Sequence, residues 1–281
     1  MRTPEQTRPE EKTRPPQSEA VETKSGTSSK PGGGGPTSSL PYKLARYLTM
    51  PIILAGVCIA LYLWVSSQTL DSIEARNLNA ELIVEKLVRH LEITVIATIA
   101  VVALAVSAGV ILTRPAMRRV SPYIVAVAST GQAMPSIGVI VLIAVLLNQF
   151  GFTIAIVALV ITAFLPVLRN TMVGIQQVDQ SVIEAGRGMG MTKRAVLWKI
   201  ELPLAIPIML AGIRTALIIV VGTAALATFI NAGGMGDFIN TGIKLSRETI
   251  LITGSVLTAV LALSVDYVAG IAEDVLRPKG L

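Results

Sequence analysis

Long apolar runs separated by short polar breaks make up the chain from about position 44 onward. A membrane-spanning helix needs about 20 mostly apolar residues, and six runs come close to or exceed that length. Backbone groups in lipid must be satisfied within each segment or in a closed barrel, and these runs lack the polar–apolar alternation that strands show. We therefore predict an all-α membrane protein with six transmembrane helices, at about 48–65, 93–112, 123–147, 152–168, 204–230 and 250–271.

The first 41 residues contain no apolar run and are rich in Pro, Gly, Ser, Thr, Glu and Lys. Such a segment buries too little apolar surface to offset the entropy that ordering removes. We expect residues 1–41 to form a disordered tail before a transmembrane domain of residues 42–281. A solvated tail is favoured over one that binds a regulatory partner.

Composition agrees with the hydropathy pattern. Hydrophobic residues make up 52% of the chain and charged residues 15%, whereas soluble proteins carry about 25% charged residues. One cysteine and one histidine exclude a disulfide framework and argue against a metal site. The net charge of +6 comes from Lys and Arg that flank the apolar runs, not from a basic stripe with interleaved aromatics. We therefore expect membrane lipid as a partner, and no nucleic acid.

Lys and Arg beside the predicted spans indicate the orientation of the chain. They gather at 43–46, 114–119, 169–199 and 277–279, and these segments all fall on one side of the membrane. The positive-inside rule makes that side cytoplasmic, so both termini should face the cytoplasm. The opposite loop at 66–92 also carries three basic residues, which weakens the assignment slightly.

Within that outer loop, Leu82, Ile83, Leu87 and Leu91 recur at helical spacing. We predict that residues 81–90 form an amphipathic helix that lies on the outer surface before the second span. Docking of a receptor protein is the functional alternative to this structural role.

Two ionisable residues lie inside predicted spans, where insertion costs about 2.5–3.5 kcal/mol at the bilayer centre. Arg214 lies roughly 15 Å into the fifth span and Asp266 roughly 8 Å from the inner end of the sixth. The long Arg stem can close that gap. We expect the two side chains to interact, directly or through a polar neighbour, and to fix the packing of the two helices. A place in the translocation path is the alternative.

Prolines interrupt the third and fourth predicted spans at Pro135 and Pro166, and each should bend its helix by removing a hydrogen bond. Freed carbonyls need polar neighbours, and bent helices of this kind often line a pathway. Packing around small residues explains the same pattern equally well. The candidates for the translocation path are Met134, Pro135, Ser136, Thr223 and Thr228.

Three glycines, Gly233, Gly234 and Gly236, lie within four residues after the fifth span. Glycine reaches backbone angles that other residues avoid. This stretch therefore predicts a tight re-entrant turn at the outer mouth, between the fifth and sixth spans.

A charged and glycine-rich segment, residues 179–203, separates the fourth and fifth spans. Ser181 can cap a short helix there, with Glu184 reaching back to the cap amide. Each glycine costs roughly 1 kcal/mol relative to alanine inside a helix, so the three glycines between 186 and 190 should limit this helix to one or two turns. The chain must then change direction.

Beyond that corner, Thr192 can cap a second helix that runs to Lys199. Pro203 and Pro207 should stop or kink it, because neither has a backbone donor. The segment thus predicts a short exposed helix, a tight corner and a second helix that leads back into the membrane.

The spacing within this segment resembles the EAA loop in permease subunits of ATP-binding-cassette (ABC) importers. In that loop Glu-Ala-Ala is followed after three residues by Gly and after nine more by Ile-x-Leu-Pro, and only Gly186, in place of Ala, differs here. The resemblance implies the type I importer permease fold and a coupling helix that seats in a groove of the ATPase subunit, with Gly186 leaving the docking knob small. The ATPase-coupling residues that it implies are Glu184, Ala185, Gly186, Gly190, Ile200, Leu202 and Pro203.

Further runs, at 184–192, 201–207, 211–216 and 232–239, are similar to the osmoprotectant branch of this family, whose members import glycine betaine, choline, carnitine or proline betaine. The resemblance covers about 92–266. The second hypothesis is that the chain belongs to the same type of importer but moves amino acids or sulfonates. The third, a stand-alone secondary transporter or channel, predicts paired acidic residues within spans or an internal repeat, and the sequence has neither.

The resemblance also implies partners. No Gly-x4-Gly-Lys-Ser/Thr phosphate-binding loop occurs, so we expect ATP hydrolysis in a separate subunit and no catalytic residue or cofactor here. The implied complex has two permease chains, identical or paralogous, two cytoplasmic ATPase subunits and an extracytoplasmic substrate-binding protein, in the bacterial cytoplasmic (inner) membrane. Only 4% of the residues are aromatic, too few for the cages that hold quaternary amines, so recognition should reside mainly in the binding protein.

Overall fold

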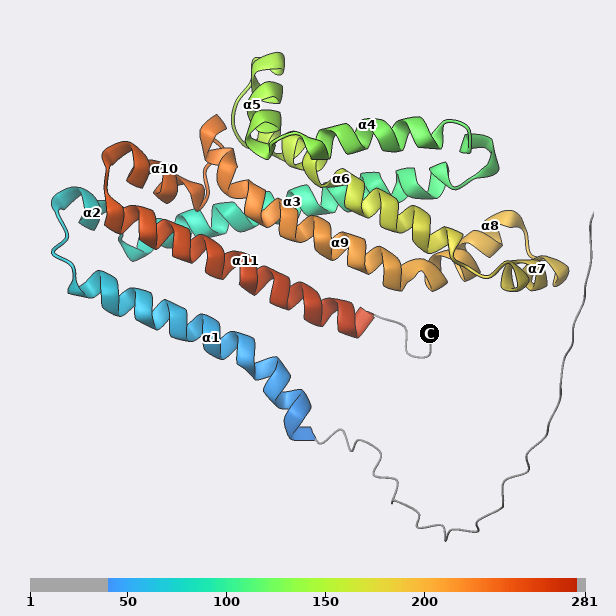
Figure 1. Cartoon of the computed structure of the whole chain (residues 1–281), viewed down its shortest axis with the longest axis horizontal. Helices are drawn as coiled ribbons and strands as arrows, with labels where there is room; N and C mark the ends of the chain where they lie inside the picture. The colour runs from blue at the N-terminus through green and yellow to red at the C-terminus, as the bar shows by residue number, and fades with distance from the viewer. Residues whose placement is uncertain (1–39, 277–281) are drawn as a thin grey trace, which may run out of the picture. The chain divides into compact units, whose positions relative to one another are not determined.

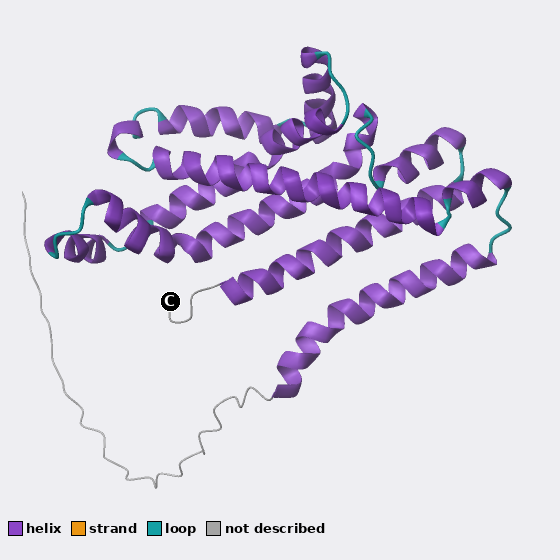
Figure 2. Ribbon diagram, turned by 180° about the vertical axis from the view of Figure 1, so that it is seen from behind, coloured by secondary structure: helices purple, strands orange, loops and turns teal. Residues whose placement is uncertain are grey.

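The computed structural model describes the backbone of residues 40–276 and the side chains of residues 47–276. Every regular element in that part of the chain is a helix, and it contains no strand (Figure 1, Figure 2). The predicted tail, 1–41, lies outside the described residues except for its last two, which already belong to the first helix. The features described below all belong to the compact unit of residues 44–281.

The helices follow one another through short connections. In chain order they are α1 (Leu40–Ser67), α2 (Ser72–Asn77), α3 (Ala80–Leu112), α4 (Ser121–Ala133), α5 (Ser136–Leu147), α6 (Phe152–Gln176), α7 (Gln180–Gly188), α8 (Lys193–Val196), α9 (Leu202–Ala224), α10 (Gly236–Leu245) and α11 (Glu248–Leu276). A π-helical turn, Leu197–Glu201, joins α8 to α9, and 3-10 turns lie at Pro115–Met117 and Ala225–Ile230. The prediction of an all-helical protein is confirmed.

Within residues 40–276, five helical segments are long and apolar enough to cross a membrane, and α4 with α5 makes a sixth if the two cross together. The five are 47–67, 80–112, 152–176, 193–230 and 248–276. A crossing needs about 20 residues, whereas α4 has 13 residues and α5 has 12. Six spans are therefore reached only when this pair counts as one.

The predicted third span is not one gently bent helix. α4 and α5 meet at 104°, and the break between them lies at Met134 and Pro135. Proline disfavours helical angles in the residue before it, and Met134 is extended, with φ −75° and ψ 144°. Pro166, by contrast, lies inside the continuous helix α6, which packs against both α3 and α9. The two prolines thus differ: Pro135 separates two helices, whereas Pro166 interrupts none.

The main core forms where α3, α6 and α9 pack against one another. Small residues allow the close approach: a Cβ added at Gly109 would lie 2.7 Å from the Thr171 side chain, and one at Gly212 would lie 2.5 Å from Asn170. Helices in membranes associate through such contacts, because lipid supplies no hydrophobic driving force between them. Packing around small residues is therefore present in this helix group.

α3 begins at Ala80, where the Asn79 side chain accepts a hydrogen bond from the Leu82 amide at 2.8 Å. The helix predicted at 81–90 is present, but it is continuous with the predicted second span, because these residues form the first turns of α3. Their apolar side chains pack against a second core cluster built from α9, α10 and α11. This packing supports the structural role of the segment rather than receptor docking.

Candidate functional site

Residues 179–203, here called the elbow, join α6 to α9 (Figure 1). The carboxylate of Asp179 accepts a hydrogen bond from the Ser181 amide at 2.8 Å and caps α7. This amide holds the pKa of the Asp179 carboxyl below its usual value. The predicted cap by Ser181, with Glu184 reaching back, is wrong, because the helix already begins at Gln180.

The corner of the elbow lies at Gly190, whose φ is +84°. Left-handed angles cost other residues roughly 1–2 kcal/mol, so glycine suits this position. The Thr192 hydroxyl then accepts a hydrogen bond from the Ala195 amide at 3.2 Å and caps α8. The predicted corner and the second cap are both confirmed.

The elbow has two arms: α7 before the corner, and α8 with the π turn after it. The second arm does not end at Lys199 as predicted. α8 passes through the π turn into α9, and the Leu202 amide donates to the Leu197 carbonyl five residues back. Pro203 lies in the first turn of α9, where a proline is tolerated. Residues 193–230 consequently form one apolar helical segment that neither Pro203 nor Pro207 stops.

The two arms of the elbow enclose a small core of their own. Its members are Val178, Ile183 and Val196, with Met191, Ile200 and Leu204 packed against them. Gly186 faces this core, since a Cβ added there would lie 2.6 Å from Cδ1 of Ile200. Gly186 is buried and points away from the exposed side of α7. An alanine there would require the tip of the Ile200 side chain to shift.

The outside of the elbow is open. Glu184, Ala185 and Gly190 are exposed. Met189 and Trp198, on the two arms, are 75% and 70% exposed. The outer side of the elbow thus presents charged, small and large apolar side chains that no other part of the described chain covers.

An ion pair fastens the elbow to the end of α3. Nη2 of Arg114 lies 2.6 Å from Oε2 of Glu201, whose side chain is only 8% exposed. A carboxylate so far removed from water needs a partner, because an unpaired buried charge is strongly destabilising. Our sequence reasoning missed this pair, since Glu201 occupies the variable position of Ile-x-Leu-Pro. The signal that could have revealed the pair is the position of Glu201, an acidic residue just before a predicted span.

At the opposite end of the helices lies the outer turn, defined here as residues 231–237. Gly233 and Gly234 have φ values of +84° and +103°, which confirms the tight turn predicted there. Gly236 is required for a different reason: a Cβ added to it would lie 1.8 Å from the Ala225 carbonyl oxygen. The three glycines thus serve both backbone angle and close packing.

Three side chains of α3 hold the outer turn. Nζ of Lys86 lies 2.9 Å from Oδ2 of Asp237, and Nε of Arg89 donates to the carbonyl of residue 232 at 3.2 Å. His90 is fully buried and accepts a hydrogen bond from the Met235 amide through Nδ1, at 3.3 Å. Its Nε2 therefore carries the proton, which faces the carbonyl of residue 221 in α9 at 2.9 Å.

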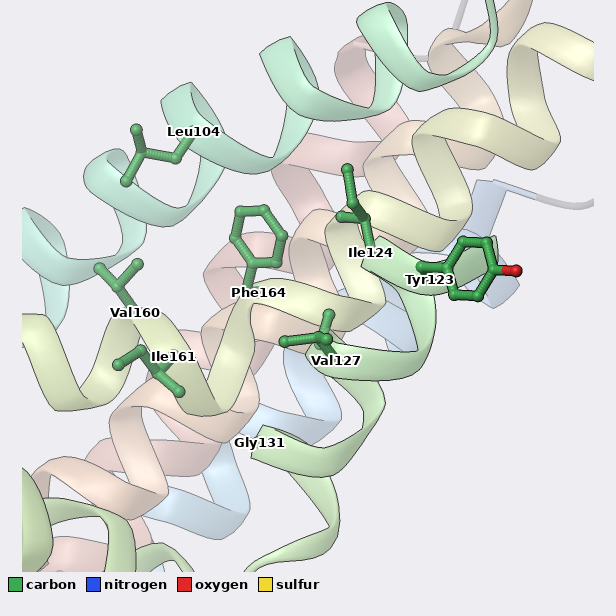
Figure 3. Close-up of a pocket in the computed structure, with 9 residues that line it drawn as sticks. Leu104, Tyr123, Ile124, Val127, Gly131, Val160, Ile161 and Phe164 are labelled. Carbon is green, nitrogen blue, oxygen red and sulfur yellow. The ribbon is translucent and has the colours of Figure 1, made fainter. Parts of the chain in front are cut away.

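The five candidates for the translocation path do not gather in one place. The Thr228 hydroxyl donates to the carboxylate of Asp237, and both residues line a polar recess of about 550 Å³ at the outer turn. Thr223 is buried in α9, and residues 134–136 form the break between α4 and α5. The nearby Gly131 lines an apolar cavity of about 620 Å³ between α3, α4 and α6 (Figure 3).

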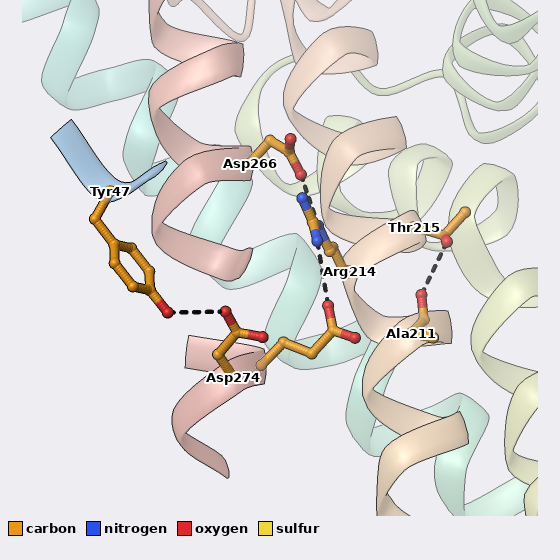
Figure 4. Close-up of polar contacts among 7 residues, drawn as sticks. Tyr47, Ala211, Arg214, Thr215, Asp266 and Asp274 are labelled. Atoms are coloured by element: carbon orange, nitrogen blue, oxygen red, sulfur yellow. Dashed lines mark hydrogen bonds and ion pairs between the residues drawn. The ribbon is translucent and has the colours of Figure 1, made fainter. Parts of the chain in front are cut away.

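Arg214 of α9 lies between two carboxylates of α11 (Figure 4). Its Nε is 2.8 Å from Oδ1 of Asp266, and its Nη1 is 3.3 Å from Oε2 of Glu273. The direct contact expected between Arg214 and Asp266 is present, and it ties α9 to α11. Sequence reasoning missed Glu273, although it follows Asp266 by seven residues and so shares its helix face.

Residues 105–279, which include the elbow and the outer turn, match the family described as binding-protein-dependent transport system inner membrane component. This chain belongs to that family. The permease is accordingly a multi-pass protein of the inner membrane and a non-catalytic subunit of an ABC transporter.

Relatives of this permease carry the names of transport proteins. It is 41% identical over 196 residues to the choline transport system permease protein OpuBB of Bacillus subtilis, covering 70% of this chain and 89% of the relative. It is 40% identical over 193 residues to the carnitine transport permease protein OpuCB of Listeria monocytogenes, covering 69% and 87%. The osmoprotectant import permease protein OsmY of Salmonella typhimurium is 36% identical over 223 residues, covering 79% and 92%.

Solved permeases share the fold. A chain of the MetNI methionine ABC transporter, in an inward facing conformation, matches with a TM-score of 0.62 at 23% identity, covering 70% of this chain and 97% of that chain. A chain of an amino acid ABC transporter solved with histidines matches with a TM-score of 0.60 at 18% identity, covering 74% and 99%. The expected type I importer permease fold is confirmed.

Proposed function

We propose that this permease is the membrane subunit of an ATP-driven importer of osmoprotectants, in the class of glycine betaine, choline and carnitine. The observation that carries the proposal is the 41% identity over 70% of the chain to a choline transport permease. Relatives named for carnitine and for glycine betaine, carnitine and choline match over similar lengths. The solved amino acid transporters are at most 23% identical, and that likeness concerns the fold alone.

The ATPase docks on the outside of the elbow, and ATP is hydrolysed in that separate subunit. The support is the exposure of Glu184 and Ala185 on α7, above a small core that keeps α7 and the second arm together. The absence of a phosphate-binding loop from the sequence agrees with this division of labour. Gly190 acts indirectly, by setting the corner that presents α7.

The elbow and both termini face the cytoplasm, and the outer turn faces an extracytoplasmic substrate-binding protein. The support is the placement of Lys and Arg beside the spans, together with the binding-protein dependence in the family description. A second permease chain, identical or paralogous, completes the pathway.

ATP binding closes the ATPase pair and displaces the elbow. Because the second arm of the elbow continues into α9, the displacement enters the spans directly. ATP and substrate shift the permease between its two states only as far as each prefers one of them. The polar recess at Thr228 and Asp237 is the proposed entry for the solute, which it holds weakly because the chain has few aromatic side chains.

Uptake by a deletion strain tests the substrate class. Loss of the gene should abolish ATP-dependent uptake of labelled glycine betaine, choline or carnitine and leave methionine uptake intact, and the gene on a plasmid should restore it. Loss of methionine uptake alone would overturn the osmoprotectant assignment in favour of the amino acid alternative. Uptake that continues after ATP is depleted would overturn the ATP-driven mechanism.

Reversal of one charge tests the docking surface. Glu184→Lys should weaken ATPase binding about tenfold or more, because charge reversal at the centre of a small interface costs at least about 1.4 kcal/mol. Glu81→Lys makes the same charge reversal at an exposed position outside the elbow and serves as the control. Titration of the purified ATPase against permease in nanodiscs measures both. Equal affinities for the two variants would place the ATPase elsewhere.

A further inference from the structure

We propose that α3 couples the elbow to the outer turn, so that a displacement at the ATPase end is carried to the end where solute enters. The direction of this signal rests on the proposed function, whereas the contacts described below stand without it. α3 has 33 residues and is thus about 50 Å long. It is therefore long enough to reach from one end of the spans to the other.

The outer end of α3 holds the outer turn with three side chains. Arg89 and His90 follow Lys86 by three and four residues, so both lie on the same face of the helix as Lys86. Their partners, a carboxylate, a carbonyl and an amide, all belong to residues 231–237. His90 is fully buried, so the outer turn cannot shift against α3 without exposing or breaking these contacts.

The inner end of α3 holds the elbow through Arg114. Besides its ion pair with Glu201, the guanidinium donates from Nε to the Val110 carbonyl at 3.1 Å and from Nη2 to the Thr113 hydroxyl at 3.1 Å. These contacts tie the side chain of Arg114, two residues beyond the end of α3, to the last turn of that helix. A movement of Glu201 is therefore passed to α3 and is not absorbed by a loose side chain.

Between its two ends, one face of α3 is buried in the helix packing. Ile93, Ala97, Val101 and Ala105 recur every four residues, and each is fully buried. Gly109 continues the stripe and faces Thr171 across a gap too small for a methyl group. Protein interiors packed in this way have low compressibility and transmit strain, so the two ends of α3 move together.

The elbow is also connected to the spans covalently, through α9. This route bends more easily than α3. α9 contains Pro207 in its interior, and prolines are the usual sites at which helices bend. The π turn immediately before α9 is a second irregularity in the backbone hydrogen bonding of this segment. Glu201 ends that π turn and precedes Pro207. A displacement of the elbow therefore reaches the ion pair between Glu201 and Arg114 before it reaches the point at which α9 can bend.

Transport measurements test the consequence. In proteoliposomes that contain the permease, its ATPase and the binding protein, Arg114→Gln should lower solute imported per ATP hydrolysed about tenfold, within the usual range of coupling between sites. The exchange Arg114→Glu with Glu201→Arg should restore it. Arg169→Gln is the control, because it removes the same charge and the hydrogen bond of Arg169 goes to Ser129 of α4 instead of the elbow. An equal effect of Arg114→Gln and Arg169→Gln would overturn the proposal.

A double-mutant cycle separates coupling through α3 from local damage at either end of the helix. Lys86→Gln breaks the contact of α3 with Asp237 at the far end. If α3 carries the signal, Lys86→Gln added to Arg114→Gln should lower import per ATP little further, because the link is already broken. Losses that multiply would show that the two ends act independently and would overturn the proposal.

Hydrogen exchange supplies a readout that needs neither ATP nor solute. In the full-length permease in lipid nanodiscs, Arg114→Gln should speed exchange of the Met235 amide about tenfold, the range expected for coupled sites, while Arg169→Gln leaves it unchanged. An unchanged Met235 amide in Arg114→Gln would overturn the role of α3. A wild-type permease that imports no osmoprotectant would overturn the proposed function and leave this test standing.

Discussion

The elbow and the outer turn both use glycines between helical segments, and one glycine from each, Gly190 and Gly236, shows two different needs. Gly190 of the elbow has a φ of +84° and open space around the missing Cβ. Gly236 of the outer turn lies at the start of α10, where a Cβ would collide with the Ala225 carbonyl. One position needs glycine for its backbone angle, and the other needs it because two segments touch. The elbow is accordingly open to a partner, while the outer turn is built into the helix packing.

The two regions also differ in what holds them. The elbow has its own apolar core and one ion pair to α3. The outer turn depends on polar and charged side chains that α3 supplies. A segment with a core of its own can move as a unit, whereas a segment pinned from outside moves only with its support. This difference is what makes α3 the natural link between them.

Gly236→Ala should give the largest effect. The added Cβ would lie 1.8 Å from a backbone oxygen, and backbone cannot yield as a side chain tip does. We expect a loss of stability of about 4 kcal/mol or more, seen as a lower melting temperature of the purified permease and less protein in the membrane. Gly222→Ala is the matched control, because a Cβ there meets nothing within 4 Å. Equal melting temperatures for the two variants would contradict the packing described for the outer turn.

Gly190→Ala should give a smaller and purely local effect. The cost is the left-handed angle alone, roughly 1–2 kcal/mol, because no neighbour lies within 4 Å of the added Cβ. Gly188→Ala also meets no neighbour but has no positive φ, so it should be neutral or slightly stabilising through its higher helix propensity. Exchange rates of the α7 amides measure both variants. A Gly188→Ala as disruptive as Gly190→Ala would show that the corner is set by something other than Gly190.

The smallest effect is a pH dependence of the α7 cap. The pKa of Asp179 is lowered by the Ser181 amide, so its contribution is present above the ordinary value of 3.8 and is lost as the pH falls through the folded pKa. Exchange of the Ser181 amide, corrected for its intrinsic rate, should therefore show more opening at low pH in the wild type. Asp179→Asn keeps a capping oxygen without the titration and should remove the acid dependence. A dependence that persists in Asp179→Asn would assign it to another group.

Much of the candidate site was accessible from local sequence. The place of the elbow, its corner at Gly190 and the cap at Thr192 each depend on residues within a few positions of one another. Local reasoning missed the orientation of Gly186, because only the position of Ile200 on the returning arm shows that this glycine faces inward. It failed again at the prolines: Pro135 separates two helices, whereas Pro166 lies inside one.

The sequence by itself determined the helical class, the approximate spans, the EAA spacing and the contact of Arg214 with Asp266, because hydropathy, turn chemistry and the cost of charge in lipid act through single residues and their near neighbours. Only the tertiary structure decided that α3 runs unbroken from Ala80, that Glu273 joins Arg214, and that Arg114 meets Glu201 from 87 positions away. Contacts of that kind depend on which helix faces lie against each other. Helix packing sets that relation through many weak contacts at once, and no short stretch of the chain encodes it.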